Sequence, residues 1–324
     1  MFTQLPSGAR LALPGVALLA TALLAGCGGP SAEPGSTAVG FPMTISSCGR
    51  DVTIAASPQR AVTVGSVAAP LIAAAGAADR IVTRTFETAP FPGEYADELA
   101  GIETTSRTGE IAREEIIARS PDIVVSFEGA AVTADDLAQV NIPLLVTRGY
   151  CRDAAGSFDD IFADIELYGE LFGTSAVANA EVTSLRQRVD TVADRHTAQT
   201  PLRAAALIVS RDGTKISAYG STSTVSNQMR ILGLDNVFGD NATRYSEINT
   251  EALIDRDPDI VVLLTQGDQT PESARQALRD RPELAHLRAL RDNRVIVVPF
   301  GYTGPGPVAV EGLEVLDREL GALR

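Results

Sequence analysis

Arginine and tyrosine side chains follow several short apolar segments of the chain, and such residues could bind an anionic or planar ligand. A guanidinium group forms charge-assisted hydrogen bonds with anionic oxygens, and aromatic rings stack on planar groups. Because ligands of open α/β sheets bind beyond the carboxyl ends of strands, residues directly after a predicted strand are the candidates. The candidate ligand-binding residues are Arg84, Arg107, Arg148, Tyr150, Arg211, Tyr219 and Tyr302. The alternative for each arginine is a solvated surface side chain.

The elements that would position these residues include one motif that occurs twice. Residues 114–125 read EEIIARSPDIVV, and residues 251–262 read EALIDRDPDIVV. Each copy begins as an amphipathic helix, breaks at Pro, turns at Asp and continues as an apolar segment typical of a buried strand. One copy in each half of the chain indicates two similar α/β lobes of about a hundred residues each.

The order of the remaining segments predicts how these lobes are connected. Strand-like and helix-like segments alternate in both halves, which favours Rossmann-like α/β lobes with parallel sheets. Helix-like segments at 157–172 and 174–196 lie between the halves, so we expect one long α-helix to join the lobes as a stiff hinge. The expected boundaries are 44–156 for the N-terminal lobe, 157–198 for the bridging helices and 199–324 for the C-terminal lobe.

The first 43 residues predict export and a membrane anchor. Residues 1–26 contain Arg10 followed by the apolar stretch 11–25, which is typical of a signal peptide. The ending LAGC at 24–27 is similar to the bacterial lipobox and implies cleavage before Cys27 and lipidation of its sulfur. An ordinary signal peptide with an incidental cysteine is the alternative. Residues 27–43 are rich in Gly, Pro and Ser and predict a flexible tether.

Net charge and residue counts argue against several classes of function. The 324-residue chain has a net charge of −14, whereas binding to nucleic acid phosphates needs clustered Lys and Arg. Its two histidines, His196 and His286, lie near no Cys or acidic pair at metal-ligand spacing. Hydrolase motifs and glycine-rich phosphate loops are missing from the sequence. We therefore expect no nucleic acid partner, no metal site, no cofactor and no enzymatic activity.

Two cysteines remain once Cys27 is lipidated. Exported proteins keep paired cysteines oxidised, so we expect a disulfide between Cys48 and Cys151. This bond would fasten the first predicted hairpin to the loop before the bridging helices. Two free thiols are the alternative.

Taken in order, these segments resemble the substrate-binding lipoproteins of bacterial ABC importers for ferric siderophores, haem and cobalamin. The resemblance covers nearly all of the chain after Cys27. It is carried by the two copies of the repeated motif and by PQRAVTV at 58–64, AAGAADRIV at 74–82, YGELFG at 168–173 and ILGLDNVF at 231–238. In that family two α/β lobes flank one long helix, and the ligand binds between the lobes. The resemblance implies a monomer, anchored to the outer face of the cytoplasmic membrane or periplasmic, that captures a ferric siderophore.

The resemblance also implies a partner, an ABC permease dimer with its ATPase. In the family one acidic residue on each lobe docks onto the permease, and Glu114 and Glu251 match this role because each lies eight residues before the Asp of its motif. A carboxylate that stabilises a helix start is the alternative for both, and Glu110 and Glu115 would substitute if the alignment shifts by a turn. Cobalamin or haem is the alternative ligand. An exported enzyme or sensory domain is the alternative of a different class.

Overall fold

The computed structural model describes residues 40–87, 91, 93–106, 111–152, 154–197, 200–210 and 212–323. The predicted signal peptide, most of the tether, the lipidation site Cys27 and the candidate ligand residues Arg107 and Arg211 lie outside the described residues. Within those residues, no helix has the length and apolar character needed to cross a membrane.

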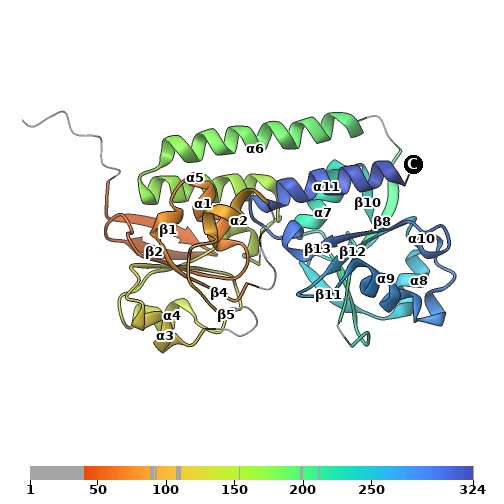
Figure 1. Cartoon of the computed structure of the whole chain (residues 1–324), viewed down its shortest axis with the longest axis horizontal. Coiled ribbons are helices and arrows are strands. Elements are labelled where there is room, and N and C mark those ends of the chain that lie inside the picture. Colours follow the sequence, from red (N-terminus) through yellow and green to blue (C-terminus); the bar gives the residue numbers. More distant parts are fainter. Residues whose placement is uncertain are drawn as a thin grey trace, which may run out of the picture. The chain divides into compact units, whose positions relative to one another are not determined.

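The first lobe contains an antiparallel hairpin and a parallel sheet (Figure 1). The hairpin pairs β1 (Met43–Ser47) with β2 (Arg50–Ile54). The sheet has the strand order β5-β4-β3-β6-β7, and each neighbouring pair in it is parallel. Its strands are β3 (Ala61–Val64), β4 (Ile81–Thr85), β5 (Thr104–Ser106), β6 (Ile123–Ser126) and β7 (Leu144–Val146). The strand order reverses between β3 and β6, and the carboxyl ends at such a reversal are where α/β sheets bind ligands.

The sheet of the second lobe combines parallel and antiparallel strands. Its strands are β8 (Leu202–Val209), β9 (Ile216–Tyr219), β10 (Leu234–Asn236), β11 (Tyr245–Ile248), β12 (Ile260–Thr265) and β13 (Val295–Pro299). The order is β11-β9-β8-β12-β13, with β10 also paired to β8. The predicted parallel core is formed by β8, β10, β12 and β13, whereas β9 runs antiparallel to both β8 and β11. A tight turn reverses the chain after β8, where the Asp212 carboxylate accepts hydrogen bonds from the Ser210 hydroxyl and the Thr214 N–H.

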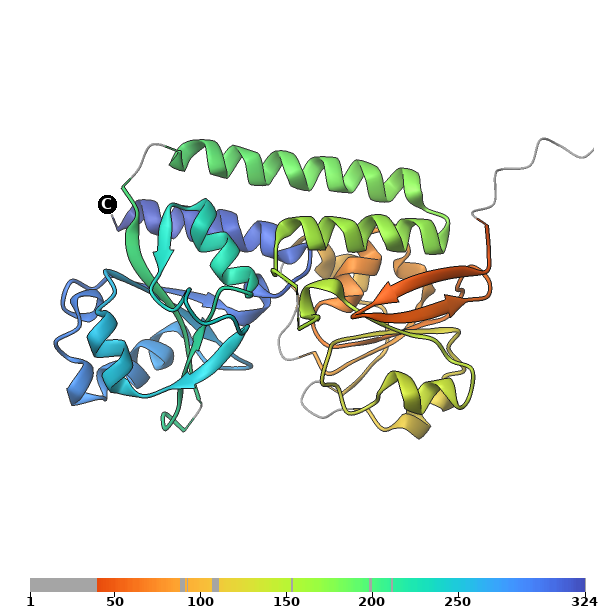
Figure 2. The same cartoon turned by 180° about the vertical axis from the view of Figure 1, so that it is seen from behind.

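Helices pack against both sheets (Figures 1 and 2). Those of the first lobe are α1 (Ala68–Ala74), α2 (Gly93–Leu99), α3 (Arg113–Ala118), α4 (Ala134–Ala138) and α5 (Phe158–Phe172). Those of the second lobe are α7 (Thr224–Ile231), α8 (Thr250–Arg256), α9 (Pro271–Arg279), α10 (Arg288–Arg291) and α11 (Val308–Ala322). Short 3₁₀ helices are η1 (Ala78–Arg80), η2 (Arg148–Tyr150), η3 (Pro282–Leu284) and η4 (Phe300–Thr303).

The repeated motif forms the same joint in both lobes, α3 to β6 and α8 to β12. The Asp122 carboxylate accepts hydrogen bonds from the backbone N–H groups of Gln59 (2.7 Å) and Arg60 (2.9 Å), and the Asp259 carboxylate accepts one from Arg203 N–H (3.1 Å). In return, the N–H groups of the two aspartates donate to the carbonyls of Arg60 (3.0 Å) and Arg203 (2.8 Å). Each Asp therefore fastens the start of its own strand to the start of the central strand, β3 or β8.

Helix α6 (Ser175–His196) connects the lobes. It packs on α5 and α1 of the first lobe and on α11 and α7 of the second, and Figures 1 and 2 show it lying along α5 and α11. The guanidinium of Arg188 in α6 forms ion pairs with Glu94 of α2 (2.8 Å) and Glu314 of α11 (2.7 Å). One apolar cluster contains Leu71, Leu171 and Leu313, from α1, α5 and α11. The lobes therefore share both an ionic link and a core.

We expect Asp122→Ala to lower the free energy of unfolding by about 1–3 kcal/mol, because two backbone N–H groups lose a charged acceptor. Asp51→Ala is the matched control, since Asp51 is an exposed carboxylate on strand β2, and its loss should change the free energy by less than about 0.5 kcal/mol. Urea unfolding measures both variants. Equal effects of the two substitutions would contradict the role of Asp122.

Candidate functional site

Three aromatic side chains stand at the carboxyl ends of the first-lobe strands. Phe86 follows β4, Phe127 follows β6, and Tyr150 lies in η2 after β7. The Phe127 ring lies 5.6 Å from the Phe86 ring and 5.8 Å from the Tyr150 ring, measured between centroids. Gly65 ends β3 with φ +90°, and a Cβ at this position would lie only 3.0 Å from the Phe127 ring. Glycine therefore permits both the turn and the close approach of the ring.

The second lobe adds two tyrosines and an arginine to this group. Tyr219 of β9 and Tyr245 of β11 are cross-strand partners, and their ring centroids are 5.8 Å apart. The Arg244 guanidinium carbon lies 4.7 Å from the centroid of the Tyr150 ring and 5.4 Å from that of Tyr245. We call Phe86, Phe127, Tyr150, Tyr219, Tyr245 and Arg244 the aromatic–Arg244 cluster. It draws residues from both lobes and carries a cation between aromatic faces.

Tyr150 and Tyr219 are the candidate ligand residues that belong to this cluster. Tyr219 is 4% exposed, and burial raises the pKa of its phenol, which stays neutral. Tyr245 is 52% exposed, so the cluster reaches solvent on the second-lobe side. The cluster can stack on planar groups and attract negative charge.

Arg84 occupies the interior of the first lobe. Its side chain is 7% exposed and forms an ion pair with Glu87 at 3.3 Å and a hydrogen bond to the Thr104 hydroxyl at 2.9 Å. The guanidinium also lies over the Phe91 ring, 5.5 Å from its centroid. A ligand would have to displace these interior partners, so the geometry favours a structural role for Arg84.

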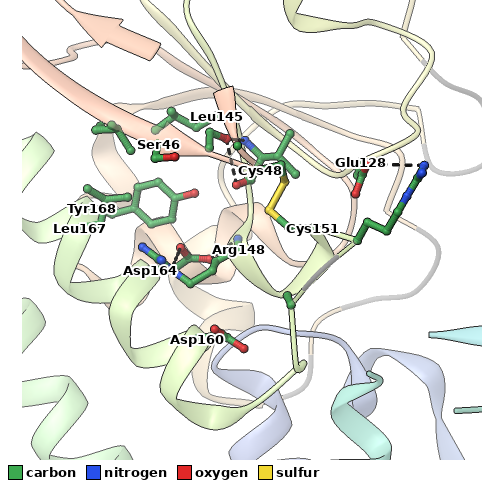
Figure 3. A pocket seen from close by; sticks show the side chains of 16 residues that line it. Ser46, Cys48, Glu128, Leu145, Arg148, Cys151, Asp160, Asp164, Leu167 and Tyr168 are labelled. Carbon is green, nitrogen blue, oxygen red and sulfur yellow. Dashed lines mark hydrogen bonds and ion pairs between the residues drawn. A yellow bond between two sulfur atoms is a disulfide. The ribbon is translucent and has the colours of Figure 1, made fainter. Parts of the chain in front are cut away.

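Arg148 faces a different site, a pocket of about 530 Å³ between the β1–β2 hairpin, η2 and α5 (Figure 3). Its Nε lies 3.6 Å from the carboxylate of Asp164, and its backbone N–H donates to the same carboxylate at 2.8 Å. The disulfide between Cys48 and Cys151 also lines the pocket, and the Cα atoms of these residues are 5.1 Å apart. The pocket contains none of the residues of the aromatic–Arg244 cluster. Because the cluster joins both lobes, whereas this pocket is lined by residues between Ile45 and Tyr168, the cluster is the candidate ligand-binding site.

Asp164 is a buried acid, 3% exposed. Burial raises the pKa of this carboxyl to about 7, and the hydrogen bond and charge of Arg148 oppose the rise. Tyr168, also in the pocket lining, is fully buried, and burial raises its pKa as well. Asp164 therefore changes its charge near neutral pH.

Tyr302 follows β13 in η4. Its hydroxyl lies 3.2 Å from the Glu311 carboxylate, and its carbonyl accepts a hydrogen bond from Gln228 at 2.8 Å. Burial and the Glu311 charge raise the pKa of Tyr302 to about 12. These partners hold Tyr302 at the start of α11, and no measured ring contact joins it to the cluster in the described part of the chain.

Four members of the cluster, Phe86, Phe127, Tyr245 and Arg244, were not among the seven candidate ligand-binding residues. Phe86 lies one residue beyond the end of β4, so a slightly longer predicted strand would have identified it. Tyr245 and Arg244 precede or begin β11, an edge strand whose residues are all exposed or half-buried and show no clear apolar pattern. A rule that searches after strands could not find residues placed before one.

The two candidate docking residues lie at equivalent places. Glu114 is in the first turn of α3 and Glu251 is in the first turn of α8, and both are exposed. A nearby cation, Arg113, lies 3.9 Å from the Glu114 carboxylate. These positions suit either a docking role or stabilisation of the helix start.

The histidines have separate environments. His196 is buried and its Nε2 lies 2.6 Å from the Asp317 carboxylate, whereas His286 is exposed. Within the residues that the structure describes, no three His, Cys, Asp or Glu side chains are grouped in a way that could hold a metal ion.

Two α/β lobes joined by a long helix, with aromatic and cationic groups from both lobes in contact, define the class of two-lobed solute-binding proteins. Residues 61–302 match the periplasmic binding protein family, and the chain belongs to that family. It is a solute-binding protein of the ABC-importer type.

Individual relatives carry more specific names. The structure of an ABC-type Fe3+-hydroxamate transport system from Saccharomonospora viridis is 32% identical with a TM-score of 0.78, covering 87% of this chain and 100% of that chain. The uncharacterized ABC transporter substrate-binding lipoprotein YvrC of Bacillus subtilis is 25% identical, and the match covers 94% of each chain. A vitamin B12-binding protein of Vibrio cholerae shares the fold at 17% identity and a TM-score of 0.65, covering 82% of this chain and 98% of that chain. A heme-binding protein of Pseudomonas aeruginosa shares the fold at 23% identity and a TM-score of 0.67, covering 80% of this chain and 91% of that chain.

We expect the free energy of unfolding of the wild type to fall as pH rises from about 5 to about 8. The fall should be about 2 kcal/mol larger in the wild type than in the Asp164→Asn variant, which lacks the titrating carboxyl. The folded-state pKa of Asp164, about 7, lies above its ordinary value of 3.8, so the folded chain binds more protons in this window. Stability from this group is therefore lost as pH rises through the folded-state pKa. Urea unfolding of both proteins at the two pH values measures the difference, and a constant gap between them would contradict the assignment.

Proposed function

We propose that the chain captures a ferric siderophore between its lobes and delivers it to an ABC permease. The observation that carries the proposal is the place of Arg244, a cation between Tyr150 of the first lobe and Tyr245 of the second. Ferric siderophores are often anionic and carry planar catecholate or hydroxamate groups. A guanidinium offers them charge-assisted hydrogen bonds, and the rings offer stacking faces. In this proposal the siderophore itself supplies every ligand of the iron.

One of the relatives supports a siderophore as the cargo. The relative named for Fe3+-hydroxamate transport is 32% identical to this chain, whereas the vitamin B12-binding and heme-binding structures fall below 25% and share the fold alone. The aromatic rings would also stack on the macrocycle of haem, which keeps haem and cobalamin as the alternative ligands. The relatives are solute-binding proteins, which favours binding over catalysis for this chain as well.

Calorimetric titration of the purified full-length chain in detergent tests the proposal. The ligands are ferric hydroxamates, ferric catecholates, ferric citrate, haem and cobalamin, and each chelator is also tested without iron. Heat is the suitable signal because the chain has no Trp. Tight binding of one ferric chelate with weak binding of its iron-free form is the expected result. Binding of cobalamin or haem alone would replace the siderophore as the ligand, and the absence of binding to every ligand of the panel would contradict the proposal.

Arg244→Gln should weaken the binding of an anionic ferric chelate by about tenfold or more, because a charge-assisted contact is lost. A neutral chelate should lose less, since only the stacking of the guanidinium disappears. Arg291→Gln is the matched control, because Arg291 is an exposed arginine on helix α10 of the same lobe and its replacement removes the same charge. Equal losses in the two variants would show that Arg244 acts only through the net charge of the lobe.

Delivery to the permease would use Glu114 and Glu251, one on each lobe. We expect Glu114→Gln combined with Glu251→Gln to keep ligand affinity and to lower uptake of the ferric chelate by cells that produce the variant as their sole copy. Asp97→Asn with Asp255→Asn is the control, since it removes one exposed charge from each lobe, on helices α2 and α8. Normal uptake with the first pair would exclude the docking role.

The proposed site of action is the outer face of the cytoplasmic membrane or the periplasm. The LAGC sequence at 24–27 supports a lipid anchor on Cys27, and the relative in Bacillus subtilis is named a lipoprotein. The proposed partners are a permease dimer and its ATPase, since substrate-binding proteins of ABC transporters work with both.

A further inference from the structure

The turn that carries Tyr150 is held from both of its ends. At its start, Thr147 N–H donates to the Ser126 carbonyl at 2.9 Å, and Arg148 N–H donates to the buried Asp164 carboxylate at 2.8 Å. At its end, Cys151 is bonded to Cys48. Tyr150 lies between the two anchors and adjoins the disulfide directly in sequence.

The disulfide ties this turn to a well-fixed part of the fold. Cys48 stands in the turn between β1 and β2, whose five residue pairs form an antiparallel ladder. The hairpin is itself fastened to the sheet, because Val146 N–H of β7 donates to the Ser47 hydroxyl at 2.8 Å. Figure 3 shows the bond between the two sulfurs beside Arg148 and Asp164. The disulfide therefore fixes the end of η2 relative to the hairpin.

The hydrogen bonds and the ion pair near this end are local or weak. The backbone hydrogen bonds from Tyr150 N–H to Thr147 and from Cys151 N–H to Arg148 lie inside the turn itself. The Arg152–Glu128 pair is 3.9 Å apart, and the Arg152 side chain is 87% exposed, so this pair contributes little. Loss of the disulfide would remove the covalent link between the end of η2 and the hairpin and leave Tyr150 held by its ring contacts and by local hydrogen bonds.

Loss of the disulfide would affect ligand binding through the position of Tyr150. Its ring contacts Phe127 in the first lobe and the Arg244 guanidinium in the second. Cys48 is exposed, Cys151 is half-buried, and both residues line the pocket of about 530 Å³. A small dithiol could therefore reach the bond, forming two cysteine thiols while its own two thiols become a disulfide.

We propose that the Cys48–Cys151 disulfide positions Tyr150 for ligand binding, so that ligand affinity depends on the oxidation state of this cysteine pair. The proposal rests on the proposed function for its effect on affinity, but its effect on the turn is independent of any ligand. A pre-organised side chain binds more tightly because less ordering remains to be done on binding.

The first test needs no ligand. Amide hydrogen exchange compares the full chain with the Cys48→Ala/Cys151→Ala variant and with wild-type chain that is reduced and alkylated while folded. We expect faster exchange at residues 147–151 and unchanged exchange in α5. Unchanged exchange at 147–151 in both forms would overturn the proposal, and the chemically reduced form decides the matter if the double variant fails to fold.

The second test measures affinity for a ferric chelate that the oxidised wild type binds. Loss of the disulfide should weaken binding by about tenfold in the wild-type background and by much less in a Tyr150→Ala background, since the side chain that it positions is already gone. Arg50→Gln is the control, because it cuts the 2.7 Å link from the hairpin to Asp135 of α4 and leaves η2 untouched.

The outcomes separate the two proposals. Equal losses in both tyrosine backgrounds, or no loss in either, would overturn the positioning role while leaving siderophore capture intact. If the oxidised wild type binds no ligand of the panel, the proposed function fails, and the exchange experiment alone decides whether the disulfide fixes the Tyr150 turn.

Discussion

The hydrogen bonds of Asp122 and Asp259 set the register on which the rest of the structure depends. Each aspartate joins the start of its strand to the start of the central strand of its sheet. Because side chains alternate along a strand, a slip of one residue would turn each of them to the opposite face. In the first lobe the fixed register brings Gly65 and Phe127 together at the far ends of β3 and β6. The hydrogen bonds of Asp122 at the start of the strands thus determine that Gly65 and Phe127 are in contact at their carboxyl ends.

A second constraint acts between the lobes. Helix α6 packs against helices of both lobes, and Arg188 within it binds carboxylates from α2 and α11. The apolar cluster shared by α1, α5 and α11 adds contact area that would be exposed if the lobes separated. Together these contacts favour two lobes that keep their arrangement, in line with the stiff hinge expected from a long bridging helix. Small rearrangements of side chains such as Tyr150 are then the most direct way for this site to adjust to a ligand.

Much of the fold could be predicted because its strongest elements carry local signals. The helices at 158–172 and 175–196 agree closely with the predicted segments, since Ser157 caps the first and Gly173 ends it in the left-handed region. The repeated motif identified β6 and β12 for a similar reason. Strands β9 and β11 escaped prediction because their pairing depends on a turn and on each other; β9 is largely buried, whereas no residue of β11 is buried. Their antiparallel pairing is set by tertiary structure and cannot be predicted from the periodicity of apolar residues.

The candidate site could be predicted only in part. The structure places the candidates Tyr150 and Tyr219 in the cluster, although Tyr219 lies on an antiparallel strand, to which the rule of carboxyl ends does not apply. Arg84 and Arg148 stand near the expected strand ends, but Glu87 and Asp164 bind their guanidinium groups. The partners of a charged side chain decide whether it is available, and those partners come from the packing of distant segments.

The contact between Arg244 and Tyr150 also bears on how fast a ligand could enter. A ligand that stacks on the face of Tyr150 that Arg244 covers must first separate the guanidinium from that ring, and a cation–π contact of this kind is worth about 0.5–1 kcal/mol. Such a cost corresponds to a reduction of the association rate by a factor of about two to five. Entry would therefore stay fast, and differences in affinity among related chelates would arise mainly from how long each remains bound. This arrangement of residues would therefore distinguish ligands more by their residence time than by their association rate.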